Sequence, residues 1–399
     1  MVPSATMRSR PVVLTFGLLT GLFAAGYGVM FTVLDDFRDS YGISASALGL
    51  VVAMGFFSSF LAQVLIAPLA DRGHARQLVF VGMLFNVGGL VAMAAGKSVV
   101  PLLLARFVMG IGAGMAVPAV RRIVILADPD RLGHNVGRLL AADVCGFAAG
   151  PALSAVLVGP FGIPAPFLVI AAATVACLPV IVRVHVVESS SAPRTRLAFD
   201  LLRLRPYAAA VVLGAAVFLM IGTFDALWVL VLSDLGASDW MANIGITIFA
   251  LPLIVLGSAG GRMAQRLGPY RVGSVGLLIG ALFMFLYGQM PTGAAMLVVG
   301  IFHSVNDGFT MSSTGVAVGL TAPPERQAAA QGLLGGVQTL VGGLTALAAG
   351  AIYEGLGRTV AYTCCALAMT TLVVVAIVLA GPQARRRTAH ESIELVTIA

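Results

Sequence analysis

Charged residues are scarce in this sequence. Asp, Glu, Lys and Arg make up only 10% of the 399 residues, whereas hydrophobic residues make up 59% and the mean hydropathy is +0.99. A typical soluble domain carries about 25% charged residues, so this chain has too few to cover a surface that faces water. The composition therefore excludes an ordinary soluble protein and predicts a chain that crosses a membrane many times.

Cysteine and lysine are scarce as well. The four cysteines lie inside apolar stretches without the spacing of metal ligands, so we predict neither a disulfide framework nor a metal site. Of the 24 basic residues only Lys97 is a lysine, and the arginines stand in short loops. Despite the net charge of +7, this distribution does not indicate a surface that binds nucleic acid.

Long hydrophobic runs are abundant. A transmembrane helix needs about 20 apolar residues. Dividing the chain at charges and at Gly and Pro turns predicts twelve spans: 12–34, 44–69, 77–96, 99–125, 137–159, 164–185, 207–233, 240–261, 270–290, 292–319, 328–353 and 359–381. We therefore predict an all-α membrane protein with an N-terminal six-helix bundle (1–185), a cytoplasmic linker (186–206), a C-terminal six-helix bundle (207–381) and a cytoplasmic tail (382–399).

The basic residues predict the orientation of the chain. Twenty of them fall on the same side of the membrane as the N-terminus, whereas Arg38, Lys97 and Arg358 fall on the other side. Loops rich in basic residues face the cytoplasm. The pattern therefore predicts a multi-pass protein of a bacterial-type inner membrane, with both termini in the cytoplasm.

The two halves of the sequence repeat one another. Three pairs of positions recur with an offset of 194 or 195 residues: 67–72 with 261–266, Gly42 with Gly236, and Gly137 with Gly332. Two six-helix halves in the same orientation are typical of a large class of transporters whose substrate site lies between the halves, near the middle of the membrane.

The loop after the second predicted helix carries a family pattern. Residues 67–76 read Ala-Pro-Leu-Ala-Asp-Arg-Gly-His-Ala-Arg. This loop resembles that of the major facilitator superfamily, Gly-x-x-x-Asp-Arg-x-Gly-Arg-Arg/Lys, and matches it at Asp71, Arg72 and Arg76 but not at its two glycines. The resemblance implies that these three residues latch the two halves together on the cytoplasmic side. Alternatively, the arginines only help to set the orientation.

Two further segments carry the same resemblance, which covers essentially the whole chain. Arg106 in the fourth predicted helix is followed by three glycines, as in the Arg-bearing fourth helix of the family. In the fifth helix, the spacing of Gly137, Gly146 and Gly150-Pro151 closely resembles the antiporter motif of the 12-helix drug/proton exporters. Small residues on one helical face let another helix approach closely. The resemblance implies that this packing favours exchange over leakage.

Ionisable residues inside the predicted spans are the best indication of mechanism, because each is costly to bury. In the superfamily, helices one, four, seven and ten line the cavity, and Asp35, Arg106, Asp225 and Asp307 come one from each. A buried carboxyl favours its neutral form and can carry a proton. We predict Asp307 first and Asp225 second as proton carriers, with Arg106 biasing their charge. His303, four residues before Asp307, shares the proton or forms a hydrogen bond.

Other residues are candidates for the walls of the cavity. Five are aromatic: Phe31, Phe224, Trp228, Phe302 and Phe309. Each of these has packing or lipid contact as its alternative role. Asp35 and Asp36 have an alternative as hydrated residues of the outer loop, and Asp143 has one as an interhelical hydrogen-bonding group.

Together these features predict a monomeric, proton-coupled exporter of small amphipathic or cationic compounds. It would work by alternating access and need no cofactor, because the proton gradient supplies the free energy. One alternative is a facilitator that exports an endogenous metabolite, lipid or siderophore. Another is an intramembrane prenyl-transfer enzyme, because Asp35, Asp36 and Asp39 have the Asp-Asp-x-x-Asp spacing that holds Mg²⁺ and diphosphate. A second acidic motif is missing, so we predict that the protein is not an enzyme.

Overall fold

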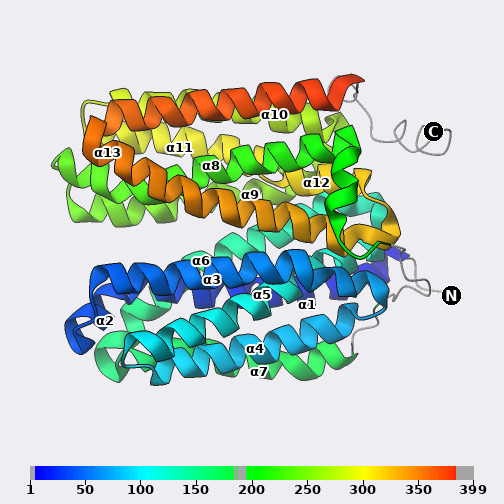
Figure 1. Ribbon diagram of the computed structural model, residues 1–399, viewed down its shortest axis with the longest axis horizontal. Helices are drawn as coiled ribbons and strands as arrows, with labels where there is room; N and C mark the ends of the chain where they lie inside the picture. Colours follow the sequence, from blue (N-terminus) through cyan, green and yellow to red (C-terminus); the bar gives the residue numbers. More distant parts are fainter. Residues whose placement is uncertain (1–4, 184–185, 187–194, 383–399) are drawn as a thin grey trace. The chain divides into compact units, whose positions relative to one another are not determined.

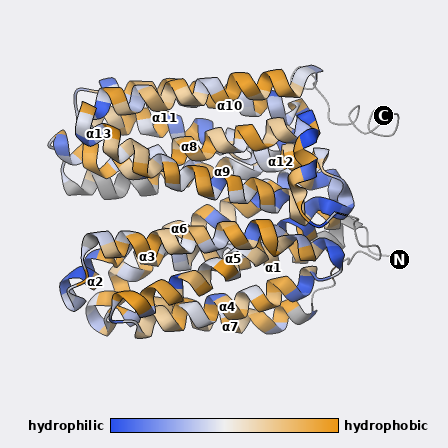
Figure 2. Ribbon diagram, in the orientation of Figure 1, coloured by the Kyte–Doolittle hydropathy of each residue, from blue (hydrophilic) through white to orange (hydrophobic). Residues whose placement is uncertain are grey.

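Helices form every regular element in the part of the chain that the computed structural model describes, residues 5–183, 186 and 195–382 (Figure 1). Hydrophobic residues run along the helices and hydrophilic residues gather near their ends (Figure 2). Hydrophobic residues along the helix and hydrophilic ones at its ends are expected of helices that cross a membrane. A helix suits this environment because its backbone polar groups are hydrogen-bonded within the helix itself.

The helices that precede residue 184 are α1 (Ala5–Thr32), α2 (Leu34–Tyr41), α3 (Ala45–Leu65), η1 (Ala67–Arg72), α4 (Ala75–Ala95), α5 (Val99–Ala127), η2 (Pro129–Arg131), α6 (Leu132–Phe161) and α7 (Pro164–Arg183). Those that follow residue 194 are η3 (Ala198–Arg203), α8 (Arg205–Asp234), α9 (Asp239–Leu267), α10 (Pro269–Gln289), α11 (Gly293–Thr310), α12 (Ser312–Thr321), η4 (Pro324–Arg326) and α13 (Gln327–Ala380). Elements labelled η are short 3₁₀ helices.

The twelve predicted spans correspond to helices among the described residues. Ten segments are long and apolar enough to cross a membrane. One of them, Pro324–Ala380, holds two crossings, because Gly357 interrupts α13 with φ 79° and ψ 174°. The twelfth crossing is the predicted span 292–319, which is divided at Met311 into α11 and α12. The all-helical membrane fold with two six-helix halves is therefore confirmed.

The chain forms two compact units. Unit 1 comprises residues 1–130, 142–198 and 323–336, and unit 2 comprises the rest of the chain. Two short segments thus group with the unit that holds the other half of the sequence. They are 131–141, which includes the start of α6, and 323–336, which includes the start of α13. The two segments correspond to each other at an offset near 195. Each half of the sequence thus contributes an equivalent segment to the unit of the other half.

Parts of two predicted segments lie outside the described residues. In the predicted linker 186–206, residues 187–194 are not described, and the described part contains η3. In the predicted tail 382–399, only residue 382 is described.

The repeat is visible in the backbone. Three pairs of glycines with positive φ recur at offsets of 194 or 195 residues: Gly42 and Gly236 (67° and 65°), Gly73 and Gly268 (83° and 95°), and Gly162 and Gly357 (81° and 79°). Positive φ is costly for residues with a Cβ atom, so glycine is retained where a helix must end in a tight turn. Equivalent turns therefore end equivalent helices in both halves of the sequence.

The predicted antiporter motif packs α6 tightly against its neighbours. A Cβ atom on Gly146 would overlap the carbonyl oxygen of Gly21 in α1, and one on Gly150 would crowd the backbone near Val29. Gly137, nearer the start of α6, lies in the same way against the carbonyl oxygen of Gly257 in α9. These three predicted glycines therefore bring helix backbones into direct contact, whereas Pro151 is exposed.

We expect Gly146→Ala to destabilise the protein, because the added methyl group would force α1 and α6 apart. Overpacking of this kind costs about 1–3 kcal/mol. The matched control is Gly159→Ala in the same helix, where an added Cβ would meet no atom within 4 Å. Thermal unfolding of the detergent-purified protein measures both effects. Equal midpoints for the two variants would contradict the assigned contact.

Candidate functional site

His303 and Asp307 lie together in the interior of unit 2. Both side chains are buried, and Nε2 of His303 is 3.5 Å from Oδ2 of Asp307 on the next turn of α11. The Tyr287 hydroxyl forms a hydrogen bond of 3.0 Å with Nδ1 of His303, and Asn306 donates one of 3.3 Å to Oδ1 of Asp307. Oδ2 itself has no hydrogen-bond partner among the described residues. The arrangement can therefore hold a proton on either the acid or the imidazole.

Aromatic and sulfur-containing side chains surround this pair. The His303 ring lies 5.1 Å from the Phe283 ring and 5.4 Å from the Phe249 ring, measured between centroids. Sδ of Met220 is 3.3 Å from Nε2 of His303. Phe224 and Trp228, two of the predicted wall residues, stack at 4.8 Å. Because Phe224 also contacts Phe249 at 4.6 Å, these two residues belong to the same aromatic cluster as the histidine.

Other residues predicted for the site lie elsewhere. Asp225 follows Phe224 in α8, but its side chain is exposed, whereas that of Phe224 is buried. Phe302 is 64% exposed and Phe309 is half-buried. The side chain of Phe31 lies outside the described residues. The structure therefore gathers Asp307, His303, Phe224 and Trp228 in one place and leaves Asp225 and Phe302 on the surface of unit 2.

Asp35 lies on the short surface helix α2 rather than in α1. Its exposed carboxylate pairs with Arg38 at 3.0 Å, and Arg38 pairs with Asp39 at the same distance. The hydrogen bond to Asp39, followed by the negative charges of Asp39 and Asp35, raises the pKa of Arg38. Asp35 thus belongs to an exposed cluster of charges with Arg38 and Asp39. This position fits its alternative role as a residue of the outer loop better than a role in the cavity wall.

Arg106 lies in the interior of unit 1. Its side chain is 0% exposed, and Cζ of the guanidinium is 4.4 Å from the centre of the Tyr27 ring. None of its three guanidinium nitrogens has a hydrogen-bond partner within the described part of the chain. A buried cation over an aromatic face gains some attraction from the ring, but its N–H groups remain unsatisfied.

Asp71 of the predicted latch holds the start of α13. Its Oδ1 accepts a hydrogen bond of 3.0 Å from the backbone N–H of Ala328, and Oδ2 accepts one of 2.8 Å from that of Ala329. Nε of Arg122 donates to the same carboxylate at 3.0 Å. Asp71 therefore caps a helix N-terminus, where a negative charge is favourable. Arg72 and Arg76 of the same motif are half-buried nearby in the sequence.

A neutral version of this cap occurs at the equivalent position of the repeat. Gln265, the counterpart of Asp71 at an offset of 194, accepts a hydrogen bond of 2.7 Å from the backbone N–H of Gly133 at the start of α6. Gly133 is in turn the counterpart of Ala328. Beside this contact, Nη1 of Arg262 lies 3.0 Å from Nδ1 of His134. The same geometry is thus built twice, once with a charged acceptor and once with an amide.

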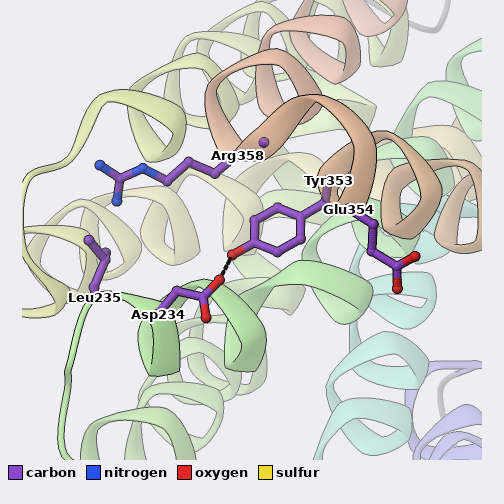
Figure 3. Close-up of a pocket in the computed structure, with 6 residues that line it drawn as sticks. Asp234, Leu235, Tyr353, Glu354 and Arg358 are labelled. Atoms are coloured by element: carbon purple, nitrogen blue, oxygen red, sulfur yellow. Dashed lines mark hydrogen bonds between the residues drawn. The ribbon is translucent and has the colours of Figure 1, made fainter.

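An open depression of about 520 Å³ lies where α8 ends and α13 is interrupted. Its lining residues are Asp234, Leu235, Tyr353, Glu354, Gly357 and Arg358. The Tyr353 hydroxyl is hydrogen-bonded to Asp234, while the side chains of Glu354 and Arg358 extend in opposite directions (Figure 3). Because its polar groups diverge, the depression does not present a converging set of ligands.

Sequence reasoning missed three residues of these sites. Tyr287 and Arg122 come from helices whose contacts with His303 and Asp71 depend on packing across the bundle, and no sequence signal pointed to them. Gln265 did have a signal, because the repeat places it at the position of Asp71.

Solved structures with the same fold are membrane transporters. The human organic anion transporter MFSD10 superposes with a TM-score of 0.76 at 17% identity, covering 92% of this chain and 99% of that one. The proton:xylose symporter XylE gives a TM-score of 0.78 at 14% identity, covering 98% and 99%. At these identities the likeness shows the fold.

The sequence profile of the Major Facilitator Superfamily matches residues 16–232 and 210–397. The chain therefore belongs to the major facilitator superfamily. It is similar to the quinolone resistance protein NorA of Staphylococcus aureus, with 30% identity over 153 residues, or 37% of this chain and 38% of NorA. It is 25% identical over 138 residues, 35% of each chain, to the putative uncharacterized transporter YgaY of Escherichia coli. Each match thus spans little more than a third of the relative.

We expect the two caps to contribute unequally to stability. Asp71→Ala leaves Arg122 buried without its carboxylate, and breaking a buried ion pair costs about 3–5 kcal/mol. Gln265→Ala removes a neutral cap, which costs about 1 kcal/mol. Thermal unfolding midpoints compare the two variants. Replacing Arg122 with Met in the Asp71→Ala background should recover part of the loss, and equal midpoints for the single variants would contradict this assignment.

Proposed function

We propose that this transporter exports small amphipathic or cationic compounds in exchange for protons. The proton gradient would supply the free energy, with no bound cofactor, and the protein would act as a monomer in a bacterial plasma membrane with both termini in the cytoplasm. The observation that carries the proposal is the buried pair of Asp307 and His303 in unit 2. Ionisable groups within a membrane protein are costly and are retained where protons or ions move.

The surroundings of the pair support a role in proton exchange. Oδ2 of Asp307 has no other hydrogen-bond partner among the described residues, and a proton between Oδ2 and Nε2 of His303 could be carried by either atom. Tyr287 holds Nδ1 on the other side of the imidazole, which restricts the ring to one orientation. Uptake and release of one proton would then change the charge inside unit 2, and such a change can favour one conformation over another.

The aromatic cluster and the relatives support the proposed cargo. Phe224 and Trp228 offer apolar faces within van der Waals reach of other rings, which suits a flat amphipathic molecule. NorA is named for quinolone resistance. Quinolones are therefore the first compounds to test, although the similarity covers only part of that protein. Asp225, exposed one residue beyond Phe224, is retained as the second proposed proton carrier.

The two helix caps support alternating access. Asp71 and Gln265 each hold a helix start through hydrogen bonds to backbone N–H groups, and such contacts can be broken and remade during a conformational cycle. In the proposed cycle Asp71, Arg72 and Arg76 act as the latch. The glycine contacts of α6 keep their helices packed while substrate and proton exchange.

Transport by protein reconstituted in liposomes tests the proposal. A pH gradient should drive uptake of a quinolone, or of a cationic dye, into vesicles by the wild type. Asp307→Asn keeps the shape but cannot ionise, so gradient-driven uptake should fall by about tenfold or more. Exchange of labelled for unlabelled compound without a gradient should persist.

Two further variants sharpen the test. Asp225→Asn should lower gradient-driven uptake less than Asp307→Asn does. Asp39→Asn, an exposed acid on α2, serves as the matched control and should transport like the wild type. If Asp307→Asn accumulates the compound as the wild type does, Asp307 does not couple protons. If the wild type itself ignores the pH gradient but exchanges its cargo, the protein is a facilitator.

A further inference from the structure

Two buried arginines on α5 differ in their surroundings. Arg122 and Arg106 are 1% and 0% exposed. Arg122 donates through Nε to the carboxylate of Asp71 at 3.0 Å. Arg106, four and a half turns earlier in the helix at about 3.6 residues per turn, has no hydrogen bond on Nε, Nη1 or Nη2 from any described residue. The same helix thus holds one arginine with its anion and one without.

The space around Arg106 is adapted to a guanidinium. Its charge lies over the Tyr27 ring of α1, and it lies against α3 at Gly55, where an added Cβ would be only 3.0 Å from Cζ, Nε and Nη2. A larger residue than glycine would displace the group. Helix packing therefore holds the cation in place without satisfying its donors.

A buried guanidinium without an acceptor is unfavourable, and the group that matches it best is a carboxylate, which takes two parallel hydrogen bonds. Asp71, the buried acid found in the described part of unit 1, is already engaged by Arg122 and the start of α13. We propose that Arg106 binds a carboxylate group of the transported compound. The inference rests on the proposed function and predicts that, among its amphipathic substrates, those that bear a carboxylate bind more tightly than matched compounds without one.

The position of Arg106 has a consequence for the cycle. Because its side chain is 0% exposed, the carboxylate binds only after the helices around it have moved. Arg106 and the proposed proton site at Asp307 belong to different units of the chain.

Equilibrium binding to the full-length purified protein tests this inference without requiring transport. The probes are a quinolone carboxylic acid and its methyl ester, which share one ring system and differ in the anion. We expect the wild type to bind the acid at least tenfold more tightly than the ester. Arg106→Gln should bring the ratio of the two affinities close to one, and Arg106→Lys should keep part of the preference.

Controls separate the charge of Arg106 from its structural effect. Gly55→Ala shifts the guanidinium but keeps the charge, so it should reduce the preference without abolishing it. Arg122→Lys alters the other buried arginine and should leave the acid-to-ester ratio unchanged. If Arg106→Gln fails to fold, the acid-to-ester ratios of Arg106→Lys and Gly55→Ala, compared with that of the wild type, decide the matter. The inference is overturned if the wild type binds acid and ester equally, if it binds neither, or if Arg106→Gln keeps the preference.

The outcome is distinguishable from failure of the proposed function. Proton-driven transport of a permanently cationic dye that needs Asp307, combined with equal binding of acid and ester, refutes only the role of Arg106. Preference for the acid in a protein that ignores the pH gradient refutes proton coupling and leaves the carboxylate site in place.

Discussion

Charged side chains between transmembrane helices lose their hydration and must regain that free energy from a neighbour. Asp71 and Arg122 do so together, and their carboxylate also receives two backbone N–H groups of α13. The start of α13 is therefore joined to η1 and α5 by one buried carboxylate that accepts hydrogen bonds from α13 and α5. Arg106 and Asp307 are the opposite case, because burial leaves the guanidinium nitrogens of Arg106 and Oδ2 of Asp307 without a hydrogen-bond partner within the described residues. In the proposed cycle these are the groups that meet cargo and proton.

The internal repeat supplies the same backbone geometry twice and lets the chemistry differ. Ala328 and Gly133 donate to Asp71 and Gln265 at corresponding positions. Close contacts also correspond, because Gly137 meets the backbone of Gly257 as Gly332 meets that of Gln63. Backbone contacts of this kind require glycine at the meeting point, whereas the polar partner can change from carboxylate to amide without altering the path of the chain. The two halves of the sequence therefore share the positions of these backbone contacts and differ in the charge of the side chain that accepts the hydrogen bond.

The candidate site was only partly readable in the sequence. The spacing of His303 and Asp307 placed them on one helical face, and the structure brings them together as that spacing requires. Phe224 and Asp225 are adjacent in sequence, yet they point in different directions, because successive residues of a helix project about 100° apart. Only the packing of α8 decides which of them meets the histidine. The partners Tyr287 and Arg122 come from other helices, where no periodicity could reveal them.

The sequence by itself determined the number of crossings and the duplication of the fold. It also determined the turns at Gly42 and Gly236, since hydropathy, helix length and positive φ are local properties. Only the tertiary structure decided which charges are satisfied. Whether a buried arginine meets a carboxylate, as Arg122 does, or none, as Arg106 does, depends on helices more than 30 residues apart in the chain that pack side by side.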